Sequence, residues 1–452
     1  MATATELSVN TAASALDMAE AIFGSGIQVV TATYSGSTVS SGIYTGASTT
    51  LAGISPTDHG VILSTGNLAD FTNASGTSNT NTFSGTSTNT TGGVDGDAQL
   101  TAIAGVNTFD GAILQAEFIP DGEFLTMRFV FTSEEYPEYV NGGVNDAFGV
   151  WVNGSFVPAT ITTKGEIAID TVNGTSNRNL YIDNTADQYN TEMDGFTRVL
   201  TIKAHVNPGE VNSIKIGIAD GGDAIYDSNL LIMGDSIQTI ALAFDDQITL
   251  APNSSRSFDI LANDIDQTES GLTITHINGT AVATGQTVTL QTGEQVRLNA
   301  DGTVTVFSDA DTGKSNLTYT VVDGDGNVDD GFISIITKTG TALDGIVQGS
   351  AGSDLIDFAY QGDPDGDKID HNDATGAGGT TGEADYVLAG AGNDSIVAGA
   401  GNDKIFAGAD NDSVYGGAGN DWADLGSGND LFGTNGTDSA GSDTVYGDAG
   451  HD

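Results

Sequence analysis

Six aspartates stand nine residues apart near the end of the chain, and this period limits the possible folds more than any other sequence feature. They are Asp385, Asp394, Asp403, Asp412, Asp421 and Asp430, and the same step resumes at Asp443 and Asp452. Glycines precede most of them, and two positions after most of them comes an apolar residue: Val387, Ile396, Ile405, Val414, Phe432 and Val445. Repetition at a short fixed period indicates stacked copies of one unit. With one inward apolar side chain per short strand, the pattern predicts a parallel β-roll.

Each repeat unit offers oxygen atoms to a metal ion. Its glycines let the backbone turn sharply and expose carbonyl oxygens, and its aspartate adds a carboxylate. Stacked units together supply the roughly six to eight hard oxygens that Ca²⁺ prefers, whereas Mg²⁺ requires a tight octahedron and keeps its waters. We therefore predict several bound calcium ions, with ligands among Asp354, Asp363, Asp365, Asp367, Asp385, Gly390, Gly392, Asn393, Asp394, Gly399, Gly401, Asn402, Asp403, Gly408, Asn411, Asp412, Gly417, Gly419, Asn420, Asp421, Gly428, Asp430, Asp443 and Asp452.

The unit over residues 389–397, Ala-Gly-Ala-Gly-Asn-Asp-Ser-Ile-Val, resembles the haemolysin-type (RTX) calcium-binding repeat. The chain departs from that pattern at Asp410, which replaces a glycine, at Ala423, and over residues 431–442, where the period breaks. An earlier unit ends at Asp354 and is followed by an insertion with a dense acidic loop, 363–373. This loop is either a further calcium site or a solvated insertion. The resemblance implies a segment that folds when it binds calcium outside the cell.

The charge of the chain restricts its partners. With 61 acidic residues against 12 basic ones, the net charge is −49, so we expect neither nucleic acid nor membrane insertion. Diffuse acidity outside the repeats also fits a salt-adapted proteome, but fixed spacing inside them does not follow from solubility alone. A stack of like charges should stay open until cations bind. Because cysteine is absent, packing or metal must stabilise the fold.

The first half of the chain carries motifs that resemble the choice-of-anchor L domain. They are Val61–Gly66, Phe129–Tyr139, Val144–Gly149, Asp194–Thr197 and Ile218–Ser228. The resemblance spans about residues 6–237 and assigns no chemistry. It implies a β-sandwich whose strand ends and loops carry acidic groups.

Acidic and amide residues of these motifs are candidates for one further calcium site: Glu134, Glu135, Asn145, Asp146, Asp220, Asp223 and Asp227. The alternative is that Asn and Asp cap turns through their own backbone. We also considered Glu134 and Glu138 as a glycosidase pair. Neighbouring carboxylates in one short segment are not a pair placed across a cleft, so we expect no catalytic residues and no enzyme.

The middle of the chain resembles cadherin-like or bacterial Ig-like domains. The motifs are Phe258–Asp266 and Leu317–Gly326, and Val/Ile/Thr-rich strands recur about every ten residues between 243 and 337. Aspartates 264, 266, 323 and 325 within them are either calcium ligands near the domain junctions or caps of turns.

Local patterns give a few further expectations. The sequence predicts one helix, over Ala12–Phe23, and strands nearly everywhere else. Asn-Gly pairs at Asn153 and Asn173 each predict a β-hairpin. The Ser/Thr/Asn/Gly-rich segment 73–93 predicts an exposed loop, and composition changes near Ile240.

Together these features predict an all-β protein of three modules. We expect a jelly-roll-like β-sandwich with one short helix over 1–238, an Ig/cadherin-like β-sandwich over 244–338, and a parallel β-roll over 343–452 that continues beyond Asp452. The amino terminus lacks the basic and apolar regions of a cleavable signal peptide.

The modules favour a secreted calcium-binding surface or matrix protein of the adhesin or biofilm type. We expect it to leave the cell through a type I secretion channel and to meet glycans or cell-surface components outside. The alternative is the non-catalytic arm of a larger secreted precursor, with an enzyme or Hint module farther along.

Overall fold

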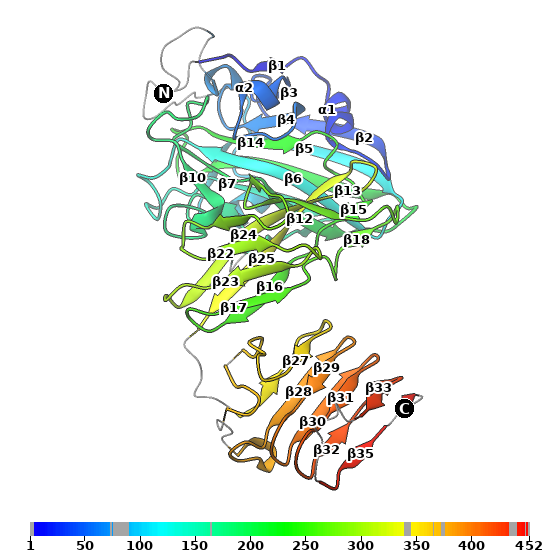
Figure 1. The fold of residues 1–452 in the computed structure, drawn as a ribbon. Coiled ribbons are helices and arrows are strands. Elements are labelled where there is room, and N and C mark those ends of the chain that lie inside the picture. The colour runs from blue at the N-terminus through cyan, green and yellow to red at the C-terminus, as the bar shows by residue number, and fades with distance from the viewer. Residues whose placement is uncertain are drawn as a thin grey trace. The chain divides into compact units, whose positions relative to one another are not determined.

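The computed structural model describes residues 4–72, 75, 90–162, 165–338, 345–364, 366–371, 376–433, 441–447 and 449–450. It divides into two compact units, residues 1–246, 263–282 and 315–334, and residues 247–262, 283–314 and 335–452. Strands dominate both units, which confirms the all-β prediction (Figure 1). The described residues contain three α-helices, α1 (Ala15–Ile22), α2 (Ala47–Thr50) and α3 (Ala98–Ala104). In those same ranges no helix has the length and apolar character needed to cross a membrane.

The amino-terminal region forms two antiparallel sheets. The first has the order β1 (Ser8–Asn10), β3 (Ser41–Thr45), β4 (His59–Ser64), β14 (Ser228–Met233), β6 (Phe124–Ser133), β11 (Gly195–Thr197) and β10 (Tyr181–Asp183), and β12 (Leu200–His205) also pairs with β6. The second has the order β2 (Ile27–Ser35), β5 (Thr108–Pro120), β13 (Asn212–Gly221), β7 (Ala147–Val152) and β8 (Ser155–Phe156), and β9 (Ile167–Ala168) pairs with β7.

The main apolar core lies between these sheets. Phe129 of β6 packs on Phe148 of β7 with ring centroids 4.5 Å apart, and Phe118 of β5 belongs to the same cluster. A second cluster covers the other face of the first sheet and includes Val130 of β6 and Leu231 of β14. Strand β6 is therefore buried on both faces over nearly its whole length, including the polar side chains of Thr126 and Arg128.

The helices are shorter and more numerous than predicted. Helix α1 begins at Ala15 rather than Ala12, because Ser14 and Asp17 form a reciprocal capping box at its start. Helices α2 and α3 were not predicted, since each is too short to show a helical period. The carboxylate of Asp97 caps α3 by accepting from the backbone N–H groups of Gln99 and Leu100.

One of the two predicted Asn-Gly hairpins is confirmed. Asn153 and Gly154 have φ values of 52° and 79°, and Val152 pairs with Ser155 across the turn. The hairpin at Asn173 is wrong, because no strand flanks this residue. Its side-chain oxygen instead accepts from the backbone N–H groups of the next turn. Most of the predicted loop over 73–93 lies outside the described residues.

The segment predicted to be Ig-like contributes strands to both compact units. The first unit contains β15 (Ala241–Leu242), β18 (Ile265–Asp266), β19 (Thr273–Ile277), β20 (Thr280–Ala281) and most of β24 (Gly313–Val322) and β25 (Val328–Thr337). The second unit contains most of β16 (Asp246–Leu250) and an antiparallel sheet in the order β17 (Ser255–Phe258), β23 (Val304–Phe307), β22 (Gln295–Leu298) and β21 (Thr287–Thr289). A turn at Asn278 and Gly279 joins β19 to β20.

The end of the chain is built from parallel strands, coloured orange to red in Figure 1. One sheet has the order β26 (Val347–Gln348), β28 (Tyr386–Ala391), β30 (Lys404–Ala409), β32 (Trp422–Asp424) and β35 (Thr444–Tyr446), with the short strands β33 (Ser427–Gly428) and β36 (Ala449–Gly450) at its side. The other has the order β27 (Leu355–Ile356), β29 (Ser395–Val397), β31 (Ser413–Tyr415) and β34 (Leu431–Phe432). This is the predicted parallel β-roll.

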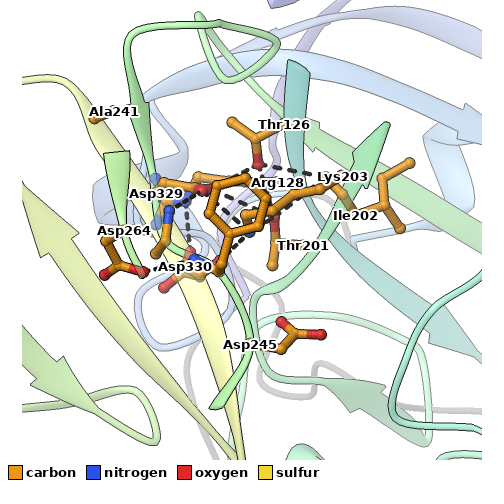
Figure 2. Close-up of polar contacts among 12 residues, drawn as sticks. Thr126, Arg128, Thr201, Ile202, Lys203, Ala241, Asp245, Asp264, Asp329 and Asp330 are labelled. Atoms are coloured by element: carbon orange, nitrogen blue, oxygen red, sulfur yellow. Dashed lines mark hydrogen bonds and ion pairs between the residues drawn. The ribbon is translucent and has the colours of Figure 1, made fainter. Parts of the chain in front are cut away.

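Within the first compact unit, two adjacent aspartates of β25 form ion pairs with two basic side chains of the amino-terminal sandwich (Figure 2). The Nε atom of Arg128 lies 2.5 Å from Asp330, and the Nζ atom of Lys203 lies 3.1 Å from Asp329. All four side chains are largely buried. Thr126 donates to Asp329 at 2.6 Å, and the N–H of Ala243 donates to the same carboxylate at 2.9 Å. These bonds satisfy the buried charges and fix the Ig-like strands of this unit against the sandwich.

We predict that Arg128→Met lowers the free energy of unfolding by about 3–5 kcal/mol, because it leaves the Asp330 carboxylate buried without its cation. Urea unfolding measures the change. The double variant Arg128→Met/Asp330→Leu should recover most of the loss, since no uncompensated charge remains. Asp235→Asn is the control: its pair with His59 is 44% and 66% exposed, so the change should stay within about 1 kcal/mol. A loss for Arg128→Met no larger than this control would contradict the prediction.

Candidate metal sites

The β-roll stacks with a step of two nonapeptides. Val387 pairs with Ile405, and Ile405 pairs with Ala423, so each residue lies beside the one 18 positions later. The predicted inward positions of the central coils are fully buried. The break after residue 431 is accommodated as a longer coil, because Ala423 pairs with Val445, 22 positions on. The insertion after Asp354 is accommodated in the same way, since Ile356 pairs with Ile396.

Glycines allow the turns of neighbouring coils to approach each other. Gly408 has φ +113°, and a Cβ atom there would lie 1.8 Å from the carbonyl oxygen of Gly390 in the preceding coil. A Cβ atom at Gly417 would likewise lie 1.9 Å from the carbonyl oxygen of Gly399. A side chain at either position would separate the coils. The absence of a Cβ therefore keeps rows of main-chain carbonyl oxygens close to the next turn, as the repeat pattern predicted.

The repeat aspartates form a ladder along the roll. The backbone N–H of Asp385 donates to Oδ1 of Asp403 at 2.8 Å, and Asp394 and Asp403 donate in the same way to the aspartates 18 residues later. Each carboxylate is thus fixed by the preceding coil through one oxygen. Its second oxygen points away from this bond.

That second oxygen is the strongest sign of a cation site. In Asp394, Asp403 and Asp412 the Oδ2 atom is buried and has no hydrogen-bond partner within the described residues. Burial, with the neighbouring carboxylates adding to it, raises the pKa of Asp394 to about 7 and that of Asp403 to about 9. Burial also raises the pKa of Asp412. Hard, charged, unsatisfied oxygens close to rows of carbonyl oxygens match the donor set that Ca²⁺ takes.

The other predicted ligands in the roll have different surroundings. The asparagines form a second, exposed ladder, in which Oδ1 of Asn393 accepts from the N–H of Asn411 at 2.8 Å. Asp443 is exposed and accepts from the N–H of Asp421 at 3.1 Å. In the acidic loop, Oδ1 of Asp363 accepts hydrogen bonds from the N–H groups of Gly366 and Asp367. The Asp363 contacts resemble turn capping, whereas the asparagine and Asp443 bonds join residues 18 and 22 positions apart in different coils. Asp365 and Asp452 lie outside the described residues.

One residue of the ladder was not among the predicted ligands. Asp370 accepts from the N–H of Ala400 at 2.7 Å and donates its own N–H to Asp385 at 3.0 Å. It therefore stands where the insertion interrupts the regular coil. Its position 15 residues before Asp385, rather than nine or 18, concealed this role in the sequence.

The predicted amino-terminal ligands gather at one end of the sandwich. Glu134, Glu135, Asp146, Asp220 and Asp227 are all buried there, and Asn145 and Asp223 are partly exposed. Glu138, the second member of the rejected glycosidase pair, is exposed on the turn that follows β6. Across the part of the chain that the structure describes, no three His, Asp or Glu side chains alone form a group that could hold a metal ion. Any cation in either region must therefore also be bound by main-chain oxygens or water.

The aspartates of the middle segment mainly close turns. Asp266 accepts from the N–H groups of Thr268 and Gly271, and Asp323 accepts from those of Asp325 and Asn327. These contacts favour the capping alternative for both residues. Asp264 differs, since it accepts from Phe244 N–H and the Tyr319 hydroxyl, and burial raises its pKa to about 7.

Three family models match the chain in succession. A choice-of-anchor L domain matches residues 7–238, a bacterial Ig domain matches residues 238–336, and the RTX calcium-binding nonapeptide repeat (4 copies) matches residues 380–414, 399–432 and 432–452. The three resemblances deduced from the sequence are confirmed, and the middle one is of the bacterial Ig kind. No curated protein matches the chain.

Solved structures show only distant similarity. One is the M60 catalytic domain with the CBM51-1 and CBM51-2 domains from Clostridium perfringens ZmpB, at 12% identity, TM-score 0.14, 52% of this chain and 19% of that one. Another is the Agl-KA catalytic domain, with 12% sequence identity and a TM-score of 0.18. The match covers 73% of this chain and 48% of that one. A third is the Bacteroides ovatus mixed-linkage glucan utilization locus SGBP-B with a mixed-linkage heptasaccharide, with 10% sequence identity and a TM-score of 0.12. The match covers 47% of this chain and 41% of that one. The chain spans less than half of each, and similarity this low does not bear on function.

We predict that Asp403→Asn stabilises the roll in a chelator at pH 8 and weakens its response to calcium. The amide keeps the oxygen that accepts from Asp385 N–H but removes a carboxyl group that must take up a proton to be buried beside the neighbouring carboxylates at this pH. Urea unfolding with EDTA and with calcium measures both effects. Asp424→Asn is the matched control, because it removes a partly exposed charge from the same roll. If the two variants changed the free energy of unfolding equally in EDTA and with calcium, the proposed role of Asp403 would be contradicted.

The metal-free roll should lose stability as pH rises. In the unfolded chain Asp394 and Asp403 titrate near 3.8, and in the folded roll near 7 and 9. Between these values the folded state binds more protons than the unfolded state, so the free energy of unfolding falls from about pH 4 and levels off above about pH 9. Urea unfolding in EDTA at pH 5 and pH 8 checks this sign. Equal or greater stability at pH 8 would contradict it.

Proposed function

Because the chain belongs to the choice-of-anchor L domain family and ends in RTX-type repeats, we propose that it is a secreted calcium-binding surface or matrix protein. Its repeats stay open inside the cell and close into the β-roll when they bind calcium outside. The single observation that carries this proposal is the row of buried carboxylate oxygens without hydrogen-bond partners at Asp394, Asp403 and Asp412.

The physical basis is the balance between burial and charge. Stacking the coils removes these carboxylates from water and brings each close to others of the same sign. An isolated ionised carboxylate is costly to bury, so coils without calcium or protons are disfavoured. A divalent ion neutralises two carboxylates at once and links consecutive coils. Folding and binding are then a single event.

The calcium concentration decides on which side of the membrane the roll forms. Extracellular calcium modules bind at about 10⁻⁴–10⁻³ M, far above the calcium level of a cytosol. Each site stabilises the folded state by RT ln(1 + [L]/Kd), and several coupled sites make the transition steep. An open chain suits passage through a type I secretion channel, and the roll then forms in extracellular fluid.

The first two modules have the binding role in this proposal. The choice-of-anchor L domain and the Ig-like segment are binding or repeat domains, and no catalytic family matches the chain. We therefore propose adhesion or matrix assembly rather than catalysis, with glycans or cell-surface components as partners. The buried ion pairs hold β25 against the sandwich within the first compact unit.

Circular dichroism and small-angle scattering test the metal-driven step. Fragment 343–452 should be expanded in EDTA and should gain β structure and become compact with millimolar Ca²⁺, but not with the same concentration of Mg²⁺. The full-length chain should contract by the corresponding amount. A fragment that is equally compact in EDTA would remove the basis of the proposal.

A further inference from the structure

A second group of carboxylates lies far from the repeats in sequence, at one end of the amino-terminal sandwich. Strand β6 ends at Ser133 and β14 begins at Ser228 in the first sheet, and these two residues are paired. In the second sheet, β13 ends at Gly221 close to the start of β7, where Ala219 pairs with Ala147. The acidic residues that follow or precede these strand ends are therefore brought to one place by the topology.

Asp146 connects the two sheets at this end. Its Oδ1 accepts from the N–H of Gly221 at 2.9 Å, and its Oδ2 accepts from the hydroxyl of Ser228 at 2.7 Å. The residue is 1% exposed. Two fixed hydrogen bonds from two different sheets hold this carboxylate in a defined position before any ligand arrives.

Two further buried carboxylates interact electrostatically with Asp146 and have unsatisfied oxygens. Glu135 is 1% exposed and Asp220 is 3% exposed. Oε2 of Glu135 and Oδ1 of Asp220 have no hydrogen-bond partner among the described residues, and neither residue forms an ion pair there. Asp220 also has a hydrogen bond with the side chain of Thr65, but a buried ionised carboxylate without a compensating charge is strongly disfavoured. Some positive species must therefore compensate this cluster when the protein is folded.

The titration of the cluster supports the same conclusion. Burial raises the pKa of Glu135 to about 9, and the nearby Asp146, Asp223 and Asp170 add to the shift. Burial also raises the pKa of Asp146 to about 7 and that of Asp220 well above its ordinary value. The interacting charges are all negative. The cluster therefore competes for protons or for a cation at neutral pH.

A further carboxylate, that of Asp227, packs against Gly66 beside the cluster. A Cβ atom at Gly66 would lie 1.9 Å from Oδ2 of Asp227, so only glycine admits the Asp227 side chain here. Asp227 interacts electrostatically with both Asp146 and Asp220. Asp223 is partly exposed and interacts electrostatically with Glu135 and Asp146, so the cluster extends to a carboxylate in contact with solvent.

We propose that Glu135, Asp146 and Asp220 hold one calcium ion in the amino-terminal sandwich, independently of the β-roll. The ion lies beside Asp146, which interacts with both of the other residues, and the unsatisfied oxygens of Glu135 and Asp220 compensate its charge directly or through water. Main-chain oxygens and water complete the shell, because the carboxylates do not form a complete metal group by themselves. Calcium fits better than magnesium, since it accepts an irregular shell of carboxylate, carbonyl and water oxygens.

Counting bound calcium in the full-length chain tests this site. Equilibrium dialysis followed by elemental analysis should give one calcium ion fewer per chain for Glu135→Gln/Asp220→Asn than for the unmodified protein. Both substitutions keep the shape of the side chain and remove its charge. Glu117→Gln/Glu123→Gln is the matched control, because it removes two exposed carboxylates from the same sandwich. The control should bind as many ions as the unmodified protein.

An unchanged count in the double variant would overturn the proposal and leave the cluster as a set of carboxylates that share protons. The roll-based function is tested separately, since Asp403→Asn should affect calcium binding by the repeats while the sandwich site stays filled. If the double variant does not fold, Asp220→Asn alone is compared with the unmodified protein by thermal unfolding. Calcium should then raise the unfolding temperature of the sandwich less in the variant, and an equal rise would count against the site.

Discussion

The stacking of one coil on the next depends on a hydrogen bond from a backbone N–H to a carboxylate oxygen 18 residues later. Asp385, Asp394 and Asp403 each donate in this way. The bond fixes the aspartates in register, but it also brings like charges together in the interior of the roll. The same interaction that defines the coil therefore creates the need for a cation. The parallel sheets and the glycine turns can form only when the charge of these carboxylates is compensated.

The positions of the few basic residues determine which other buried carboxylates lack a compensating positive charge. Against 61 acidic residues there are 12 basic ones, and two of these are buried against Asp329 and Asp330. That junction is satisfied by protein groups alone. At Glu135 and Asp220 the acids are equally buried, but among the described residues no basic side chain pairs with them. Burial combined with the absence of a partner, rather than acidity itself, separates a cation site from a structural ion pair.

The sequence predicted much of this arrangement because its signals are periodic or local. The nonapeptide spacing predicted the roll, the buried Val387 and Ile396, and the aspartate ladder. The Asn153-Gly154 hairpin followed from the φ values that such a turn requires. Pairings between distant residues could not be predicted: Asp330 with Arg128 joins residues about 200 positions apart, and only the fold brings them together. Asn173 was misjudged because an Asn-Gly pair also closes turns outside hairpins.

The two proposed sites differ in what calcium must accomplish. The sandwich has a large apolar core between its sheets, with Phe118, Phe129 and Phe131 buried in it. Hydrophobic burial on this scale stabilises the module without any ion, so a cation there adjusts one end of a structure that already exists. The core of the roll is a narrow line of small and branched side chains such as Val387 and Ala407. It buries far less apolar surface per residue, and its carboxylates oppose closure. If both proposals hold, calcium tunes the first module but determines whether the last one is folded.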